Sequence, residues 1–198
     1  MNALVYVEKR LIVPIGAKLV GSSLLAGTKT AGTAGFNWFL AASLDMSREK
    51  GVETKIAELF PEDIFNYVYD KVEHSQLSVH QLCEKISREE LRSADVVSII
   101  GNLHIPYTDV KPYNPFKPPE IKIDETYKVY GEECFSAEIE MEGFRFPIFF
   151  LIDSKEIVCY TNDKPVEVVG VLKWSPSYEV GGFALNKILL AAAVLLRR

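Results

Sequence analysis

The sequence predicts an α+β fold, with an antiparallel β-barrel in its second half, a mixed α-helical part before it and an apolar helix at its C-terminal end. Three observations lead to this prediction. Residues 134–174 contain four short apolar segments separated by turn residues, residues 52–92 carry apolar side chains at helical spacing, and residues 188–196 are apolar throughout. Short segments with tight turns are typical of antiparallel strands, and a segment that is apolar on all sides is typical of a buried helix.

The first of the four predicted strands, residues 134–142, alternates between apolar side chains and acidic or small polar ones. This period of two predicts one buried face and one wet face. Glu138, Glu140 and Glu142 fall on the wet face. Like charges in such a row are more typical of a solvated surface than of a catalytic carboxylate pair.

The other three strands are predicted at residues 144–152, 156–161 and 166–174. Gly143 supplies the first turn. Pro147 has no backbone N–H to donate, so the second strand must be bulged there or run along an edge of the sheet.

Two segments, residues 97–103 and 166–172, share a pattern in which two β-branched residues precede Gly101 and Gly170. A glycine at this point predicts a bulge or a close approach of two backbones, as where a barrel strand bends. In its strand rhythm the second half therefore resembles the oligonucleotide/oligosaccharide-binding (OB) barrel.

We divide the chain into an N-terminal part, residues 1–93, and a barrel part, residues 94–198. The N-terminal part opens with a predicted strand at residues 3–7 and a short helix after Pro14. Residues 27–35 follow, and their glycines, threonines and alanines predict a mobile loop or hinge.

Residues that favour the first turn of a helix predict three further helix starts. Pro61 precedes two acidic residues, which favour the first turn of a helix. Ser78 is a good N-cap, and Ser87 with Glu90 predicts a capping box.

Candidate chemistry in the N-terminal part is limited to two motifs. Lys29 and Thr30 invite a phosphate-binding interpretation, but the phosphate loop requires its lysine directly after a glycine, and Lys29 follows Thr28. His74, His80 and Cys83 are clustered, and His80 and Cys83 stand three residues apart, as zinc ligands on one helix face would, yet no fourth ligand is near. We therefore favour a flexible hinge and a structural helix.

A thiol site would pair Cys134 or Cys159 with His104. Both cysteines fall within strand patterns, where cysteine usually acts as a small core residue. We assign no catalytic residue, no metal and no cofactor.

Composition narrows the classes of function. The 198 residues have a formal net charge of −5, which argues against bulk attraction to nucleic acid, although a local basic face remains compatible with it. Three widely spaced cysteines favour a reducing cytoplasm. No segment approaches the roughly 18 apolar residues of a membrane-spanning helix.

Seven residues are the candidates for contact with a partner. Prolines and aromatic residues in residues 106–119 predict an extended recognition loop, or one that packs back on the barrel. Lysines and a tryptophan of the barrel part would serve nucleic acid if they share one face. The seven are Tyr107, Tyr113, Phe116, Lys155, Lys164, Lys173 and Trp174.

A short initial strand, a Gly/Ser/Thr/Lys-rich loop, Ser47-Arg-Glu, helices and the segment 95–103 follow one another in this chain. This order resembles small prokaryotic proteins grouped as a domain of unknown function, and the resemblance implies no activity. We predict a non-enzymatic cytoplasmic module that binds a protein partner or self-associates. The alternatives are a single-stranded nucleic-acid-binding protein, and an enzyme or nucleotide-binding protein that uses the Gly-rich loop.

Overall fold

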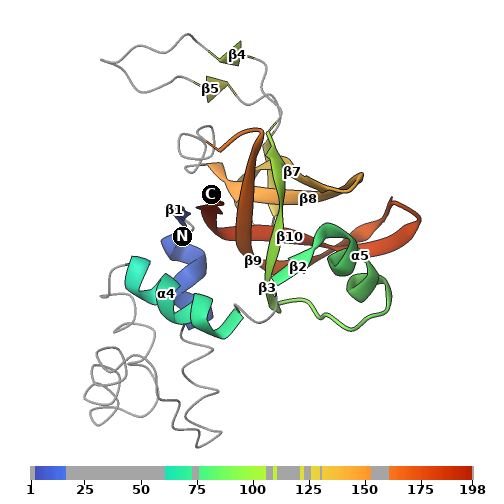
Figure 1. The fold of residues 1–198 in the computed structure, drawn as a ribbon, viewed down its shortest axis with the longest axis horizontal. Helices are drawn as coiled ribbons and strands as arrows, with labels where there is room; N and C mark the ends of the chain where they lie inside the picture. The colour runs from blue at the N-terminus through green and yellow to red at the C-terminus, as the bar shows by residue number, and fades with distance from the viewer. Residues whose placement is uncertain are drawn as a thin grey trace, which may run out of the picture. The chain divides into compact units, whose positions relative to one another are not determined.

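Figure 1 shows the fold in the computed structural model. The chain forms two compact units. The larger unit contains residues 1–6 and 75–198, and the smaller contains residues 7–74. The structure describes residues 3–16, 61–72, 76–105, 109–110, 121–122, 126–129, 131–152 and 161–197. The Gly-rich loop predicted at residues 27–35 therefore lies outside the described residues.

The described part of the smaller unit is helical. Pro61 begins α4 (Pro61–Val72), with Glu62 and Asp63 in the first turn, as predicted. The helix predicted to follow Pro14 instead spans residues 9–16 and includes that proline. The Glu8 carboxylate accepts a hydrogen bond from the backbone N–H of Arg10 at 3.0 Å, which caps the helix before the proline is reached.

The larger unit combines one described helix with ten strands. The predicted strand near the N-terminus is confirmed, and Ser78 is the predicted N-cap of the helix. The elements are β1 (Ala3–Val7), β2 (Gln76–Ser78), α5 (Val79–Ser87), β3 (Val96–His104), β4 (Asp109–Val110), β5 (Ile121–Lys122), β6 (Thr126–Val129), β7 (Glu132–Met141), β8 (Phe144–Leu151), β9 (Lys164–Val180) and β10 (Phe183–Leu196).

Five of these strands close on themselves in the order β3, β9, β10, β8, β7 and back to β3 (Figure 1). β10 and β8 are parallel, and the other four pairs of the ring are antiparallel. Outside the ring, β2 pairs with β3, β1 with β10 and β6 with β7. The short strands β4 and β5 form a separate two-stranded sheet, with β4 inside the predicted proline-rich loop, residues 106–119, and β5 just after it.

The predicted meander of four consecutive strands is correct only for its first pair. β7 and β8 form a hairpin whose two-residue turn, Glu142-Gly143, has positive φ at both positions, as a tight hairpin requires. β9 does not continue the meander, because it pairs with β3 and β10. The strand predicted at residues 156–161 lies outside the described residues except for Thr161, which is in a turn.

The predicted C-terminal helix is wrong, because residues 188–196 belong to β10. β10 lies between β9 and β8, and its residues 189–195 are all buried. A strand covered on both faces needs apolar side chains at every position, so it lacks the alternation that identifies a half-buried strand.

Gly101 and Gly170 mark close backbone approaches, as their shared pattern predicts. A Cβ atom on Gly101 would lie 2.7 Å from the carbonyl oxygen of Glu140 on the neighbouring strand. A Cβ atom on Gly170 would lie 2.6 Å from the carbonyl oxygen of Leu190. Both glycines thus allow ring strands to approach more closely than a side chain would permit.

The inside of the ring is filled with apolar side chains. Phe135 and Phe150 stack with their ring centroids 5.4 Å apart, and Ile139 and Leu189 are fully buried beside them in the same core. Helix α5 packs its buried residues into this core as well. These are Val79, Leu82, Cys83 and Ile86.

Local sequence also determines where α5 begins and ends. The Ser78 hydroxyl accepts a hydrogen bond from the backbone N–H of Gln81, and the Gln81 side chain accepts one from the Ser78 N–H, so a capping box is formed. The second predicted helix start, at Ser87, is wrong. α5 ends at that residue, and Glu89 then turns the chain with a φ of 58°.

Candidate functional site

The outer surface of β3, β7 and β8 carries the most organised group of polar side chains that the structure describes. On β7, Ala137 and Ile139 are buried while Glu138 is exposed and Glu140 half-buried, which confirms the predicted alternation. Glu142, predicted on the same face, lies in the hairpin turn instead.

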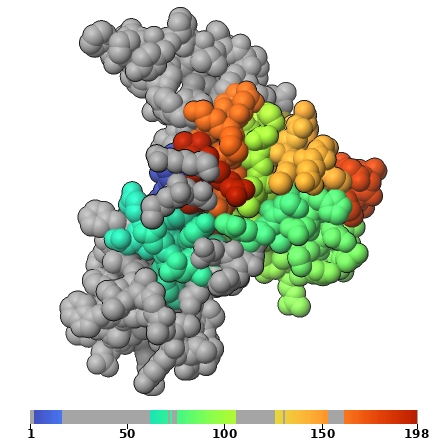
Figure 2. Space-filling model, viewed as in Figure 1, coloured from blue at the N-terminus to red at the C-terminus, as the bar shows by residue number. Residues whose placement is uncertain are grey.

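Strand register decides which side chains of this surface are neighbours. Glu138 stands between His104 of β3 and Pro147 of β8. In the next row, Glu140 stands between Asn102 of β3 and Arg145 of β8. β3 lies beside the β7–β8 hairpin in the space-filling view, where the yellow-green and the yellow-orange surfaces meet (Figure 2).

A cavity of about 390 Å³ opens on this surface. Its volume falls within the usual range of small-molecule sites. Its lining combines polar side chains with apolar ones. Among the described residues, those that line it are His104, Ile105, Ser136, Ala137, Glu138 and Pro147.

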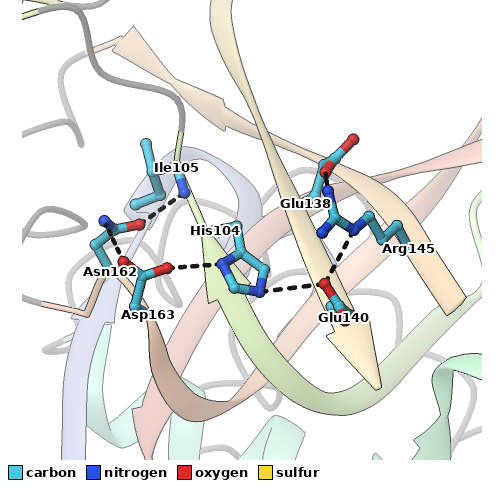
Figure 3. A network of polar contacts seen from close by, with 7 residues as sticks. All are labelled: His104, Ile105, Glu138, Glu140, Arg145, Asn162 and Asp163. Carbon is cyan, nitrogen blue, oxygen red and sulfur yellow. Dashed lines mark hydrogen bonds and ion pairs between the residues drawn. The ribbon is translucent and has the colours of Figure 1, made fainter. Parts of the chain in front are cut away.

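The imidazole ring of His104 lies between two carboxylates (Figure 3). Its Nδ1 lies 2.7 Å from Oδ1 of Asp163, and its Nε2 lies 3.5 Å from Oε2 of Glu140. Because an ionised carboxylate accepts and never donates, Nδ1 carries the hydrogen of the short contact. The ring is therefore fixed in orientation.

A tight turn before β9 positions Asp163. This residue has a φ of 56°, a left-handed conformation that aspartate tolerates better than most residues, and its backbone N–H donates to the Leu103 carbonyl at 2.6 Å. The side chain of Asn162 accepts from the Ile105 N–H at 2.7 Å and donates to Asp163 at 3.2 Å. The turn predicted at this sequence is thus tied to the end of β3.

Arg145 completes the network from β8. Its Nε lies 2.9 Å from Oε2 of Glu140, and its Nη1 lies 3.5 Å from Oε2 of Glu138 (Figure 3). The Arg145 side chain is 61% exposed, so these ion pairs contribute little to stability. Their effect is to fix where the carboxylates stand.

The network lacks the arrangement of a nucleophilic catalyst. An aspartate on Nδ1 of a histidine is half of a catalytic triad, whose nucleophile would stand at Nε2. In this site Nε2 faces the carboxylate of Glu140 instead. The two carboxylates contact opposite nitrogens of the ring and do not converge on one point, and within the described residues no group of three or more potential ligands could hold a metal ion.

The thiols that the structure describes are also unsuited to catalysis. Cys83 and Cys134 are buried, and burial raises the pKa of the Cys83 thiol to about 11. Cys134 does not line the cavity that contains His104. Cys159 lies outside the described residues. His80 packs edge-on against Phe144 with ring centroids 4.9 Å apart, so its neighbours are those of a packed side chain.

Of the sequence-predicted contact residues, the structure describes Lys164, Lys173 and Trp174, and none of these three lines the cavity. Lys164 begins β9, and Trp174 lies ten residues further along it, a separation of about 33 Å in an extended strand. Lys173 and Trp174 are adjacent in β9, where successive side chains point to opposite faces. Trp174 is 60% exposed. The remaining candidates, Tyr107, Tyr113, Phe116, Lys155, Lys29 and Thr30, lie outside the described residues.

Sequence reasoning considered His104 only as a partner for cysteine and assigned no role to Asp163. The sequence signal that could have drawn attention to Asp163 is the predicted turn at residues 162–165, because it places this aspartate just before a strand. The pairing of that strand with β3 was needed to bring the two residues together.

No family model matches the chain, and no curated protein matches it. Among solved structures, a protein described as an aspartyl-tRNA synthetase from Leishmania major Friedlin is similar over 60% of this chain and 20% of its own, with 11% identity and a TM-score of 0.35. The chain thus spans about a fifth of that protein. Such a low TM-score does not assign a fold. In the part of the chain that the structure describes, no helix is long and apolar enough to cross a membrane.

Proposed function

We propose that the ring is an OB-like barrel and that the protein is a non-enzymatic module that binds a partner on the outer surface of β3, β7 and β8. The strand order supports the first part, because an OB barrel is a five-stranded Greek-key barrel that binds ligands on the face of its second and third strands. In chain order the ring strands are β3, β7, β8, β9 and β10, so the second and third are β7 and β8.

The observation that carries the proposal is the cavity beside Glu138. The inside of the ring is filled by Phe135, Ile139, Phe150 and other core residues, which leaves the outer surface for a ligand. The wall of the cavity presents both hydrogen-bonding groups and apolar contact, which is the usual composition of a binding site.

Binding without catalysis agrees with the chemistry of the site. His104 faces carboxylates at both ring nitrogens, and the described thiols are buried. Contributions from Tyr107, Tyr113 and Phe116, a cytoplasmic location, and a nucleotide site at the Gly-rich loop stay predictions from the sequence.

Single-stranded nucleic acid is a second candidate ligand for the same surface. Tyr127 of β6 is 40% exposed and contacts Phe149 of β8 edge-on, with ring centroids 5.8 Å apart. Aromatic rings of this kind stack on bases. The carboxylates of Glu138 and Glu140 would repel the phosphates, so we place this candidate second.

The proposal is tested by titrating the full-length ¹⁵N-labelled chain with four probes: a basic peptide, an acidic peptide, an oligothymidylate and maltohexaose. We expect one class of probe to shift the amide signals of His104, Ser136 and Glu138. Ser136→Phe, which fills the cavity, should abolish those shifts, and Ser177→Phe, at an exposed position of β9, should preserve them. If all four probes leave these signals unchanged, or shift only the region around Trp174, the proposal is wrong.

A further inference from the structure

We infer that the cavity beside Glu138 binds a lysine or arginine side chain of a partner protein, with an apolar residue of the same partner resting on Phe149. This inference rests on the proposed function and specifies its ligand. Four properties of the surface support it: its charge, its unsatisfied acceptors, its apolar wall and the neighbouring aromatic residues.

The network around the cavity is negatively charged. Glu138, Glu140 and Asp163 contribute three carboxylates, and Arg145 contributes one guanidinium group. This excess favours a cationic ligand and disfavours phosphate groups, because complementary charges steer two partners together and like charges placed opposite each other are costly.

Glu138 has the greatest remaining capacity to accept hydrogen bonds inside the cavity. Arg145 approaches Glu140 to 2.9 Å but Glu138 only to 3.5 Å, which is too long for a strong charge-assisted hydrogen bond. A carboxylate has about four lone-pair positions. The half-exposed Glu138 side chain can therefore receive an ammonium or guanidinium group without first losing a strong partner.

The apolar wall suits the stem of such a side chain. Pro147 is half-buried and stands directly across the strand pair from Glu138, and it supplies the accessible apolar part of the wall, while Ile105 and Ala137 are buried behind the cavity. Lysine and arginine combine an apolar stem with a charged end, and both parts are satisfied when the stem lies on an apolar surface and the end meets a carboxylate.

The adjacent aromatic residues indicate a peptide segment in preference to a free amine. Phe149 lies two residues beyond Pro147 on β8, a distance of about 7 Å, which is also the spacing of alternate side chains in an extended peptide. A partner with an apolar residue two positions from its lysine or arginine would cover both features. A free amine would occupy only the cavity and would leave Phe149 uncovered.

The test uses the full-length chain and the peptide Gly-Phe-Ser-Lys-Ser-Phe-Gly-amide, which carries fluorescein on its N-terminal amine and presents phenylalanine on either side of the free lysine. A second peptide replaces the lysine with norleucine. Anisotropy titrations should give saturable binding of the lysine peptide only. Glu138→Gln should weaken that binding at least about tenfold, because it removes a charge-assisted hydrogen bond. Glu142→Gln makes the same change of net charge in the hairpin turn and should leave the dissociation constant unchanged.

The outcomes separate this inference from the proposed function. Equal weakening by both variants would show a general charge effect and overturn the inference. The inference also fails if the norleucine peptide binds as well as the lysine peptide, or if butylamine alone binds as tightly as the peptide. If oligothymidylate or maltohexaose shifts the cavity amides and the peptide does not, the proposed function stands and the inference is wrong. If no probe shifts them, both are wrong.

Discussion

β7 and β10 are both strands of the same ring, yet they meet different surroundings. β7 buries Ala137 and Ile139 and presents Glu138 and Glu140 on its outer surface. β10 is buried on both faces from residue 189 to residue 195. The difference explains why the candidate site is built on β7, because polar side chains that are to meet a ligand need a strand face in contact with water, whereas a buried polar group needs an internal hydrogen-bond partner.

The largest effect expected from this comparison is on folding. Leu189→Ala in β10 removes most of a fully buried side chain and should lower the free energy of unfolding by about 2–5 kcal/mol. Ser136→Ala on the outer surface of β7 should change it by less than about 0.5 kcal/mol. Urea denaturation of both variants measures the difference. Similar values for the two would contradict the distinction between the strands.

The close approach of β3 to β7 should respond strongly to a small substitution. Gly101→Ala places a Cβ atom 2.7 Å from the Glu140 carbonyl oxygen and should destabilise the fold by about 1–3 kcal/mol through overpacking. Gly143→Asn is the control, because the turn has open space around that position and asparagine tolerates a positive φ. Thermal melts compare the two. A harmless Gly101→Ala would mean that these strands are further apart than described.

The buried thiol predicts a loss of stability at alkaline pH. The pKa of Cys83 is raised from 9.0 to about 11 by burial, so between these values the unfolded chain releases the proton and the folded chain retains it. The free energy of unfolding should therefore fall as the pH rises from about 9 to about 11. Burial also raises the pKa of Tyr178, which extends the effect to higher pH.

Denaturation at about pH 8 and about pH 10.5 checks this prediction. Cys83→Ala removes the titrating group, so its stability should depend less on pH in this window than that of the unmodified chain. Identical pH dependence of the two proteins would contradict it. Ser136→Ala, on the cavity surface, is the matching control, because its free energy of unfolding should keep the full dependence on pH.

The smallest effect is expected at the exposed ion pairs of β7 and β8. Arg145→Gln removes both contacts with Glu138 and Glu140, and exposed pairs of this kind contribute about 0.2–1 kcal/mol. Binding should respond in the opposite direction, since two carboxylates are released for the basic peptide. Anisotropy titration of this variant should show tighter binding, and weaker binding would indicate that Arg145 itself contacts the ligand.

β7 could be predicted from the sequence and β10 could not. Alternation identified β7, and the Pro61 and Ser78 starts identified α4 and α5, because these signals are local. Residues 188–196 carry no alternation, so an apolar helix and a doubly buried strand could not be distinguished there. The length and the composition of this segment suit a helix and a strand equally.

The candidate site could be predicted only in part for the same reason. The wet face of β7 follows from its own residues. The contact between His104 and Asp163 joins positions 59 residues apart, and it depends on the pairing of β3 with β9. Strand pairing is a long-range property that no local pattern in these segments specifies.

The closed ring on which the candidate site depends is tested most directly by nuclear Overhauser effects between backbone protons in solution. We predict contacts between Leu103 and Ile139, which join β3 to β7, and between Ile148 and Leu189, which join β8 to β10 in parallel. Helical connectivities through residues 188–196, or the absence of both cross-strand contacts, would contradict the closed ring.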